Sequence, residues 1–199
     1  MENQQELWDK IALDWYKFRR DPKIIPKFLE KKTGKILDLG SGAGRSLIDL
    51  KTKGEMYLVD FSKEMIKLAK KRAKKHKIDA KFFVSDIVKL PFKDNFFDTA
   101  LFLAVLHCIE SKKDRAETVK ELFRVLKPGA KTIVTVWNKD SKWFKNKPKE
   151  KYVGWRDKGK RYYYLYEEKE LHNLFKKIGF KLLKTKKDHR MIIFIAQKP

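Results

Sequence analysis

The chain has 199 residues, of which 42% are hydrophobic, enough for a single domain (1–199) with a sizeable core. Its 49 basic and 26 acidic residues give a net charge of +23, which favours a polyanionic partner such as nucleic acid over charge that only aids solubility. The single cysteine, Cys108, excludes an internal disulfide and a cysteine-rich zinc site, and no apolar run is long enough to span a membrane, so we expect a cytoplasmic protein without bound metal.

The N-terminal residues predict two helices before the first strand. Apolar residues recur at helical spacing over 6–19, which predicts an amphipathic helix lying on the sheet or over a ligand. This helix is expected to end before Pro22, because the residue preceding a proline avoids the helical region. A second helix is predicted over 22–32, so residues 1–33 are expected to form a helical lid.

The stretch 35–44 is the central motif of the chain and reads Lys-Ile-Leu-Asp-Leu-Gly-Ser-Gly-Ala-Gly. It predicts a strand and a tight glycine-rich turn, followed by a helix from about Arg45 to Lys53. Glycine has no Cβ, so a ligand can lie against the backbone at the carboxyl end of the strand. The glycines stand at 40, 42 and 44, whereas the dinucleotide fingerprint needs a glycine at 45, so a nicotinamide cofactor is disfavoured.

Two acidic residues near this turn suit a ligand that has a ribose but no pyrophosphate. Asp38 lies inside the glycine motif, and Asp60 ends the next apolar run, 56–59. The Asp60 carboxylate can accept hydrogen bonds from both hydroxyl groups of a ribose.

Helices and strands alternate through the rest of the chain, which predicts an α/β fold with a parallel sheet. The fourth strand is followed by His107, which we expect near the reacting centre because parallel strands deliver their last residues to the site. The predicted elements are a helix 62–75 capped by Ser62, strands 80–84 and 99–103, a helix from Ser111 or Asp114 to Leu126, strand 133–137, helix 167–178 capped by Gly179, and an antiparallel hairpin of 180–184 with 191–196.

Residues 138–164 show no persistent helical or strand period, and lysines and arginines alternate there with aromatic residues. Exposed RNA bases stack on aromatic rings while basic side chains contact phosphates, so this basic and aromatic insertion is the candidate RNA-contacting segment. The alternative is a flexible basic insertion whose aromatic residues pack on the domain.

The glycine motif together with Asp60 resembles the class I S-adenosylmethionine-dependent methyltransferases. The resemblance implies a Rossmann-like fold with a seven-stranded, mostly parallel sheet in the order 3-2-1-4-5-7-6, flanked by helices. It also implies S-adenosylmethionine as the cofactor, with Asp86 accepting a hydrogen bond from the adenine amino group and the Ile87 amide reading a ring nitrogen. Asp86 could instead only cap a turn. The implied cofactor residues are Asp38, Gly40, Ser41, Gly42, Gly44, Asp60, Phe61, Met65, Ser85, Asp86, Ile87 and Leu103.

Four further stretches resemble one branch of these enzymes, the tRNA methyltransferases that esterify a carboxymethyl group on wobble uridine 34. They are Phe18-Arg19-Arg20-Asp21-Pro22, Ala104-Val105-Leu106-His107, Val134-Thr135-Val136-Trp137 and Arg161-Tyr162-Tyr163-Tyr164-Leu165-Tyr166. The resemblance implies that tRNA, through its anticodon loop, is the substrate. The chain departs from this branch at Cys108 and Tyr164, where histidine is common.

The resemblance assigns roles to several polar and aromatic residues. Arg19 aligns with an arginine that can hold the substrate carboxylate in a bidentate pair, or is a surface residue at a helix end. His107 positions the uracil or the carboxylate, serves as a base if the target is a ring nitrogen or hydroxyl, or is satisfied by backbone groups. Arg20, Trp137, Trp155, Arg161 and Tyr162 are the candidate substrate or RNA contacts.

Two other functions remain open at this stage: a small-molecule methyltransferase of the same fold, and an inactive methyltransferase-like RNA-binding protein. A partner is also implied, because the family often works with a small zinc-binding activator protein at the sheet edge formed by strand three. Phe82, Phe83 and Val84 make this strand apolar, which favours strand addition, unless the strand is covered internally.

Overall fold

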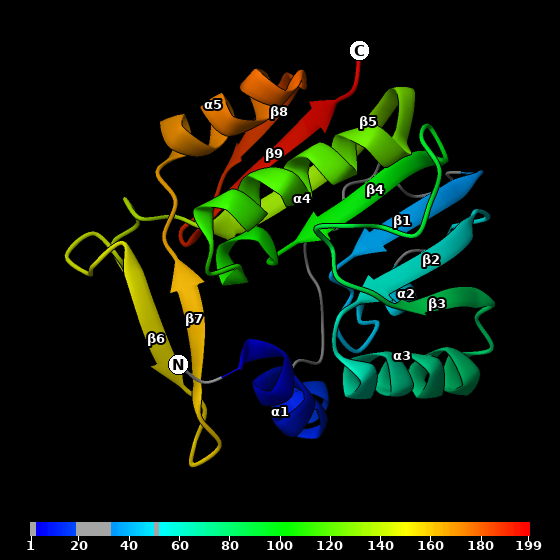
Figure 1. The fold of residues 1–199 in the computed structure, drawn as a ribbon, viewed down its shortest axis with the longest axis horizontal. Coiled ribbons are helices and arrows are strands. Elements are labelled where there is room, and N and C mark those ends of the chain that lie inside the picture. Colours follow the sequence, from blue (N-terminus) through cyan, green and yellow to red (C-terminus); the bar gives the residue numbers. More distant parts are fainter. Residues whose placement is uncertain (1–2, 19–32, 50–51) are drawn as a thin grey trace.

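The computed structural model describes residues 3–18, 33–49 and 52–199. A seven-stranded sheet in the order β3-β2-β1-β4-β5-β9-β8 forms its centre, and β6 and β7 form a separate two-stranded sheet (Figure 1). The predicted order is therefore confirmed, with the last two strands renumbered by the extra hairpin. The strands are β1 (Lys35–Leu39), β2 (Glu55–Asp60), β3 (Ala80–Val84), β4 (Phe97–Leu103), β5 (Leu126–Trp137), β6 (Glu150–Gly154), β7 (Lys160–Tyr164), β8 (Lys181–Lys187) and β9 (Met191–Gln197).

The central strands are parallel and buried on both faces. β1, β2, β3, β4 and β5 pair in parallel, whereas β9 is antiparallel to both β5 and β8. Two apolar layers sandwich the sheet, one with α4 and α5 and the other with α2 and α3, which explains the nearly uninterrupted apolar character of β1, β2 and β4. The helices are α1 (Gln4–Phe18), α2 (Ser46–Asp49), α3 (Lys63–His76), α4 (Lys112–Val125) and α5 (Glu168–Ile178), with a 3₁₀ turn η2 (Leu106–Cys108).

The predicted helix boundaries are confirmed where a capping side chain marks them. The Ser62 hydroxyl accepts a hydrogen bond from the Met65 amide at 3.1 Å, and the Ser111 hydroxyl accepts one from the Asp114 amide at 3.2 Å. Gly179, with φ of +115°, ends α5. The helix expected from about Arg45 to Lys53 is α2, which spans Ser46–Asp49 in the described residues; residues 52–53 are not helical, and 50–51 lie outside the described residues.

Residues 138–164 were expected to lack regular secondary structure. This expectation is also wrong, because part of the segment forms the regular hairpin β6–β7. Tyr152 pairs with Tyr162 in its antiparallel register. The sequence pattern does not reveal β7, because a strand with one exposed face alternates polar and apolar residues. In β7 the three consecutive residues Tyr162, Tyr163 and Tyr164 are all buried.

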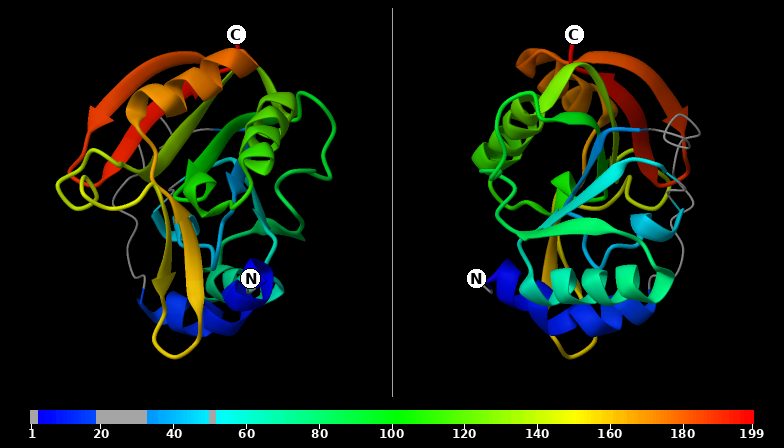
Figure 2. Two further views of the ribbon diagram at one scale, coloured as in Figure 1. Left: turned by 60° about the vertical axis from the view of Figure 1, so that its left-hand side comes forward. Right: turned by 90° about the vertical axis from the view of Figure 1, so that its right-hand side faces the viewer.

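Helix α1 lies beside α3 and against the β6–β7 hairpin (Figure 2). The Gln5 side chain donates to the Phe61 carbonyl at 2.8 Å, and Asp9 accepts from the Ser62 hydroxyl at 2.5 Å. The Gln4 side chain accepts from the Tyr162 amide at 3.0 Å, so α1 joins the start of α3 to the hairpin. The second predicted lid helix, 22–32, lies outside the described residues.

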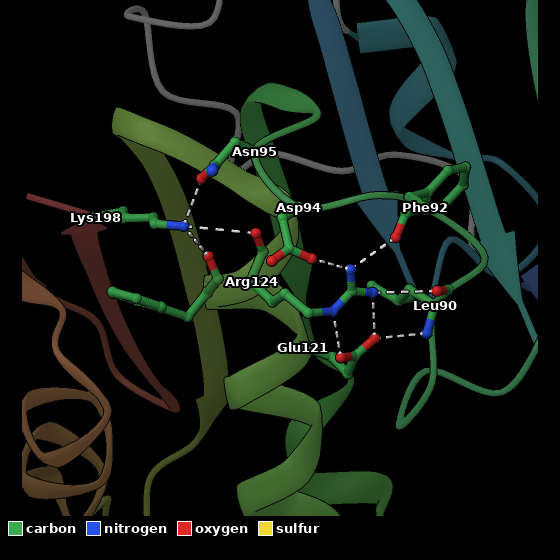
Figure 3. Close-up of polar contacts among 8 residues, drawn as sticks. Leu90, Phe92, Asp94, Asn95, Glu121, Arg124 and Lys198 are labelled. Atoms are coloured by element: carbon green, nitrogen blue, oxygen red, sulfur yellow. Dashed lines mark hydrogen bonds and ion pairs between the residues drawn. The ribbon is translucent and has the colours of Figure 1, made fainter.

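Arg124 of α4 holds the loop between β3 and β4 in place (Figure 3). Its guanidinium forms an ion pair with Glu121 at 2.7 Å, and Glu121 in turn accepts from the Leu90 amide at 2.8 Å. This pairing lowers the pKa of the Glu121 carboxyl. The same guanidinium also binds Asp94 and the carbonyls of Phe92 and Leu90, and Lys198 bridges Asn95 to the carbonyl of Phe123. The network thereby fixes residues 90–95 of the loop, which also carries Asp86 and Ile87.

Candidate active site

The glycine turn after β1 has three residues with positive φ, and they serve two purposes. A Cβ on Gly40 would lie 2.4 Å from a Val105 methyl carbon, and one on Gly44 would lie 2.9 Å from the Ala69 Cβ. These two glycines therefore permit close packing of the turn. A Cβ on Gly42 would meet nothing within 4 Å, so the backbone there faces open space in which a ligand can lie.

Asp60 joins the glycine turn to the start of α3. One carboxylate oxygen accepts from the Gly42 amide at 2.8 Å, and the other accepts from the Ser62 amide at 3.0 Å. The residue is only 7% exposed, but it is one of the residues that line a large cavity next to the glycine turn. Each oxygen keeps a second lone pair, so the carboxylate can still accept the two hydroxyls of a ribose. Burial raises the pKa of Asp60 to about 6, against the opposing effect of the two amide hydrogen bonds.

Asp38 lies behind the glycine turn instead of in the cavity. Its carboxylate is buried and accepts a short hydrogen bond from the Ser46 hydroxyl at the start of α2. Burial raises the pKa of Asp38 to about 7, and the nearby Asp60 carboxylate acts in the same direction. Asp38 therefore fixes the start of α2 and so supports the turn.

A cavity of about 940 Å³ extends from the glycine turn to the β6–β7 hairpin. Most of the predicted cofactor residues line it, together with His107 and Trp137; Asp38, Gly44 and Ser85 do not. Arg19 and Arg20 lie outside the described residues. The predicted residues that line the cavity are Gly40, Ser41, Gly42, Asp60, Phe61, Met65, Asp86, Ile87, Leu103, His107 and Trp137.

His107 lies on η2 beyond the end of β4 and is buried among aromatic rings. Its ring stacks 5.3 Å from that of Trp137 and 5.5 Å from that of Tyr163, and these two rings stack 4.2 Å apart. Ala104, three residues before His107, has a φ of +58°, a left-handed conformation that costs a non-glycine residue about 1–3 kcal/mol. The unfavourable conformation lies directly after β4, where the chain enters the wall of the cavity.

The hairpin residues predicted to contact RNA are packed inside the protein. Arg161 and Tyr162 are 6% and 3% exposed, and Tyr162 accepts a hydrogen bond from Arg115. The Arg161 guanidinium lies 4.7 Å from the Trp155 ring centroid, and Trp155 packs 5.3 Å from Trp15 of α1. The prediction that Arg161 and Tyr162 contact the substrate or RNA conflicts with this burial, because both side chains pack between the hairpin, α1 and the domain. The alternative, in which the aromatic residues pack on the domain, holds for this hairpin.

The structure adds cavity residues that the sequence analysis missed. Arg72 of α3 is 5% exposed, donates to the Ala43 carbonyl at 2.7 Å and lies 4.3 Å from the Tyr16 ring centroid. Its spacing of three residues from the buried Ala69 was the available sequence signal, because both lie on one helix face. Further lining residues come from two turns at the outer end of the cavity and include Trp143, Phe144 and Arg190.

The described residues hold no cluster of three or more histidine, cysteine, aspartate or glutamate side chains placed to bind a metal ion. Over the same residues, no helix combines the length and apolar character needed to cross a membrane.

Comparison with known proteins identifies the family. The model of a family described as "Methyltransferase domain" matches residues 30–179. The tRNA (carboxymethyluridine(34)-5-O)-methyltransferase of Arabidopsis thaliana is 32% identical over 122 residues, which cover 61% of this chain and 28% of that protein. The alignment thus spans less than a third of that relative's length.

Solved structures agree with this family. An S-adenosylmethionine-dependent methyltransferase from Methanosarcina mazei superposes with a TM-score of 0.77 at 25% identity, covering 89% of this chain and 98% of that one. The fold is also shared with a complex of the Haloferax volcanii Trm112 methyltransferase activator and a methyltransferase, with a TM-score of 0.69, 19% identity, and coverage of 99% and 98%. With the open face at Gly42 and the Asp60 carboxylate placed for a ribose, the chain belongs to the class I S-adenosylmethionine-dependent methyltransferases, and its cofactor is S-adenosylmethionine.

Proposed function

We propose that the protein methylates tRNA, esterifying the carboxymethyl group of wobble uridine 34. The observation that carries the proposal is the stack of Trp137, Tyr163 and His107. This stack lines the same cavity as the glycine turn and Asp60. Flat aromatic surfaces suit an unstacked nucleobase, and the net charge of +23 suits a polyanion. The similar protein of Arabidopsis thaliana is named as an enzyme of this kind.

The proposed chemistry needs alignment more than proton transfer. The cofactor supplies an electrophilic methyl group when bound. A carboxylate with a reference pKa near about 4 is already ionised at neutral pH, so it attacks without a general base. The protein's task is to hold the carboxylate in line with the methyl group and to exclude water, and such positioning supplies several kcal/mol.

The residues of this chain divide the task between the two ends of the cavity. Asp60 holds the ribose through its free lone pairs, and Arg72 keeps the glycine turn in place through the Ala43 carbonyl. His107 and Trp137 contact the uracil from the opposite end. Arg19 holds the substrate carboxylate in a bidentate pair, and Arg20 contacts the nucleic acid next to it.

We also propose that a small zinc-binding activator protein adds to the edge of the sheet at β3. β3 is the outermost strand, so one side of its backbone lacks a strand partner within the described sheet. Val84 on this strand is 47% exposed, although the ring of Phe83 stacks with that of Tyr57. An apolar edge strand of this kind is a docking site for another chain, as strand addition satisfies its backbone groups.

The proposed function is tested with the purified protein, labelled S-adenosylmethionine and tRNA that carries carboxymethyluridine, followed by mass spectrometry of the nucleosides. We expect a methyl ester on that nucleoside, no reaction with tRNA that lacks the carboxymethyl group, and strongly reduced product with Asp60→Asn at a limiting cofactor concentration. The reaction is run with and without the activator. Methylation of a quinone precursor or an amine, together with inert tRNA, would refute the proposal and favour a small-molecule enzyme.

The role of Arg19 is tested in the same assay with Arg19→Ala. We expect a large loss of turnover on the carboxymethyl substrate, while Arg156→Ala, which removes a charge from the exposed turn between β6 and β7, stays active. Undiminished turnover of Arg19→Ala removes Arg19 from the mechanism.

A further inference from the structure

Two turns that are far apart in the sequence meet at the outer end of the cavity. One follows β5 and contains Trp143; the other joins β8 to β9 and contains Arg190. They meet because β5 and β9 are paired, with Trp137 opposite Met191, so each turn begins where the pairing stops. The Asn138 amide donates to the Arg190 carbonyl at 2.8 Å, which ties the two turns through their backbones.

At this meeting point the Arg190 guanidinium lies 4.0 Å from the centroid of the Trp143 ring. Trp143 is 50% exposed, whereas the other four tryptophans are more deeply packed. Within the described part of the chain, the Arg190 guanidinium takes part in no salt bridge. The lining of the cavity thus contains a half-exposed aromatic ring with a guanidinium over one of its faces, and the Asp188 carboxylate accepts from the Arg190 amide at 2.9 Å.

The pair continues an aromatic wall that leads inward to His107. Phe144 follows Trp143 directly and stacks 4.9 Å from Trp137 with an interplanar angle of 18°. Trp137 stacks on Tyr163 with an angle of 17° and on His107 with an angle of 20°. These nearly parallel rings line the same cavity as Trp143.

We propose that Trp143 and Arg190 form a subsite for a nucleotide of single-stranded RNA next to the one that is methylated. The Trp143 ring stacks on the base, and the Arg190 guanidinium binds the adjoining phosphate. Stacking suits any base, because every base has an aromatic face, and a guanidinium matches the geometry of a phosphate. Lys142, whose ammonium lies 6.0 Å from the Trp143 ring centroid, adds positive charge that favours an anionic strand over an apolar protein segment.

This inference rests on the proposed function for the identity of the RNA, but its test measures binding instead of catalysis. The full chain is titrated into a fluorescent anticodon stem-loop RNA and followed by anisotropy at several salt concentrations. We expect Trp143→Ala to weaken binding about tenfold, the usual effect of removing one stacking ring, and Trp143→Phe to restore most of the affinity. Arg190→Ala is expected to weaken binding and to reduce the slope of log affinity against log salt by about 1.

Arg156→Ala is the control, because it removes the same charge from an exposed turn that does not line the cavity. It also removes an ion pair with Asp14 at 3.5 Å, but Lys158 still pairs with Asp14 at 3.0 Å. Its RNA affinity is expected to stay within about twofold of wild type. Binding of S-adenosylmethionine by all variants, measured by calorimetry, shows that the cofactor half is intact.

The outcomes separate the subsite from the enzymatic proposal. If Trp143→Ala and Arg190→Ala bind RNA as tightly as Arg156→Ala, or if the wild-type protein binds no RNA, the subsite is refuted. If these two variants bind weakly while the wild-type protein binds RNA but transfers no methyl group to it, the subsite stands and the proposed function fails.

Discussion

Protonation of Asp60 is expected to weaken cofactor binding as the pH falls. Burial raises the pKa of this carboxyl to about 6, and the structure places it to accept both ribose hydroxyls. A protonated carboxyl has an O–H in place of one acceptor, so it cannot accept both hydroxyls in the same geometry. Protonation of Asp60 therefore competes with cofactor binding at a pH only slightly below neutral.

The size of the effect follows from simple competition between a proton and the ligand. For a pKa of about 6, the apparent dissociation constant rises by a factor of 1 + 10^(pKa − pH), which is about twofold at pH 6 and about tenfold at pH 5. Asp38, with a pKa raised to about 7, titrates nearby, so the measurement is repeated in an Asp38→Asn background to isolate Asp60.

The assay is calorimetric titration with S-adenosylmethionine between pH 5 and pH 8. In Asp60→Asn we expect weak binding that no longer depends on the protonation of residue 60, with a loss of up to roughly a hundredfold, because the amide oxygen still accepts one hydroxyl and the one lost hydrogen bond to a charged acceptor contributes about 1.5–3 kcal/mol. Asp79→Asn, at an exposed carboxyl on the loop before β3, is expected to bind like wild type. Wild-type affinity that stays flat from pH 8 to pH 5 would show that Asp60 does not hold the ribose.

Three further substitutions test the support of the glycine turn. Gly40→Ala places a Cβ 2.4 Å from Val105 at a φ of +69°, so we expect a loss of about 2–3 kcal/mol in thermal unfolding, and an unchanged melting temperature would contradict the packing. The contribution of Asp38 to the stability of the wild-type protein should fall by about 4 kcal/mol as the pH rises from about 4 to 7, because native Asp38 keeps its proton up to a pKa of about 7 while the unfolded chain loses it near 3.8. Asp38→Asn lacks this decline, so its stability relative to wild type should increase over that range in urea unfolding. Arg72→Met removes the hydrogen bond to the Ala43 carbonyl and should weaken cofactor binding about fivefold to tenfold, which calorimetry would detect; unchanged affinity would make Arg72 a purely packing residue.

The sequence by itself determined the elements whose signals are local. The spacing of Gly40, Gly42 and Gly44 identifies the turn, because a run of positive φ angles and close approaches requires glycine. Ser62 and Gly179 mark helix ends because a cap acts within a few residues of itself. The apolar run before Asp60 also places this carboxylate at the end of a strand and therefore at the cofactor edge of the sheet.

Only the tertiary structure decided which residues of the basic and aromatic insertion meet the cavity. Trp155, Arg161 and Tyr162 look like RNA contacts in the sequence, yet they pack against α1, a helix about 150 residues earlier in the chain. Trp143 lines the cavity because the pairing of β5 with β9 brings Arg190 beside it. An aromatic residue between lysines has the same local pattern in both settings, and contacts between distant segments decide which one it occupies.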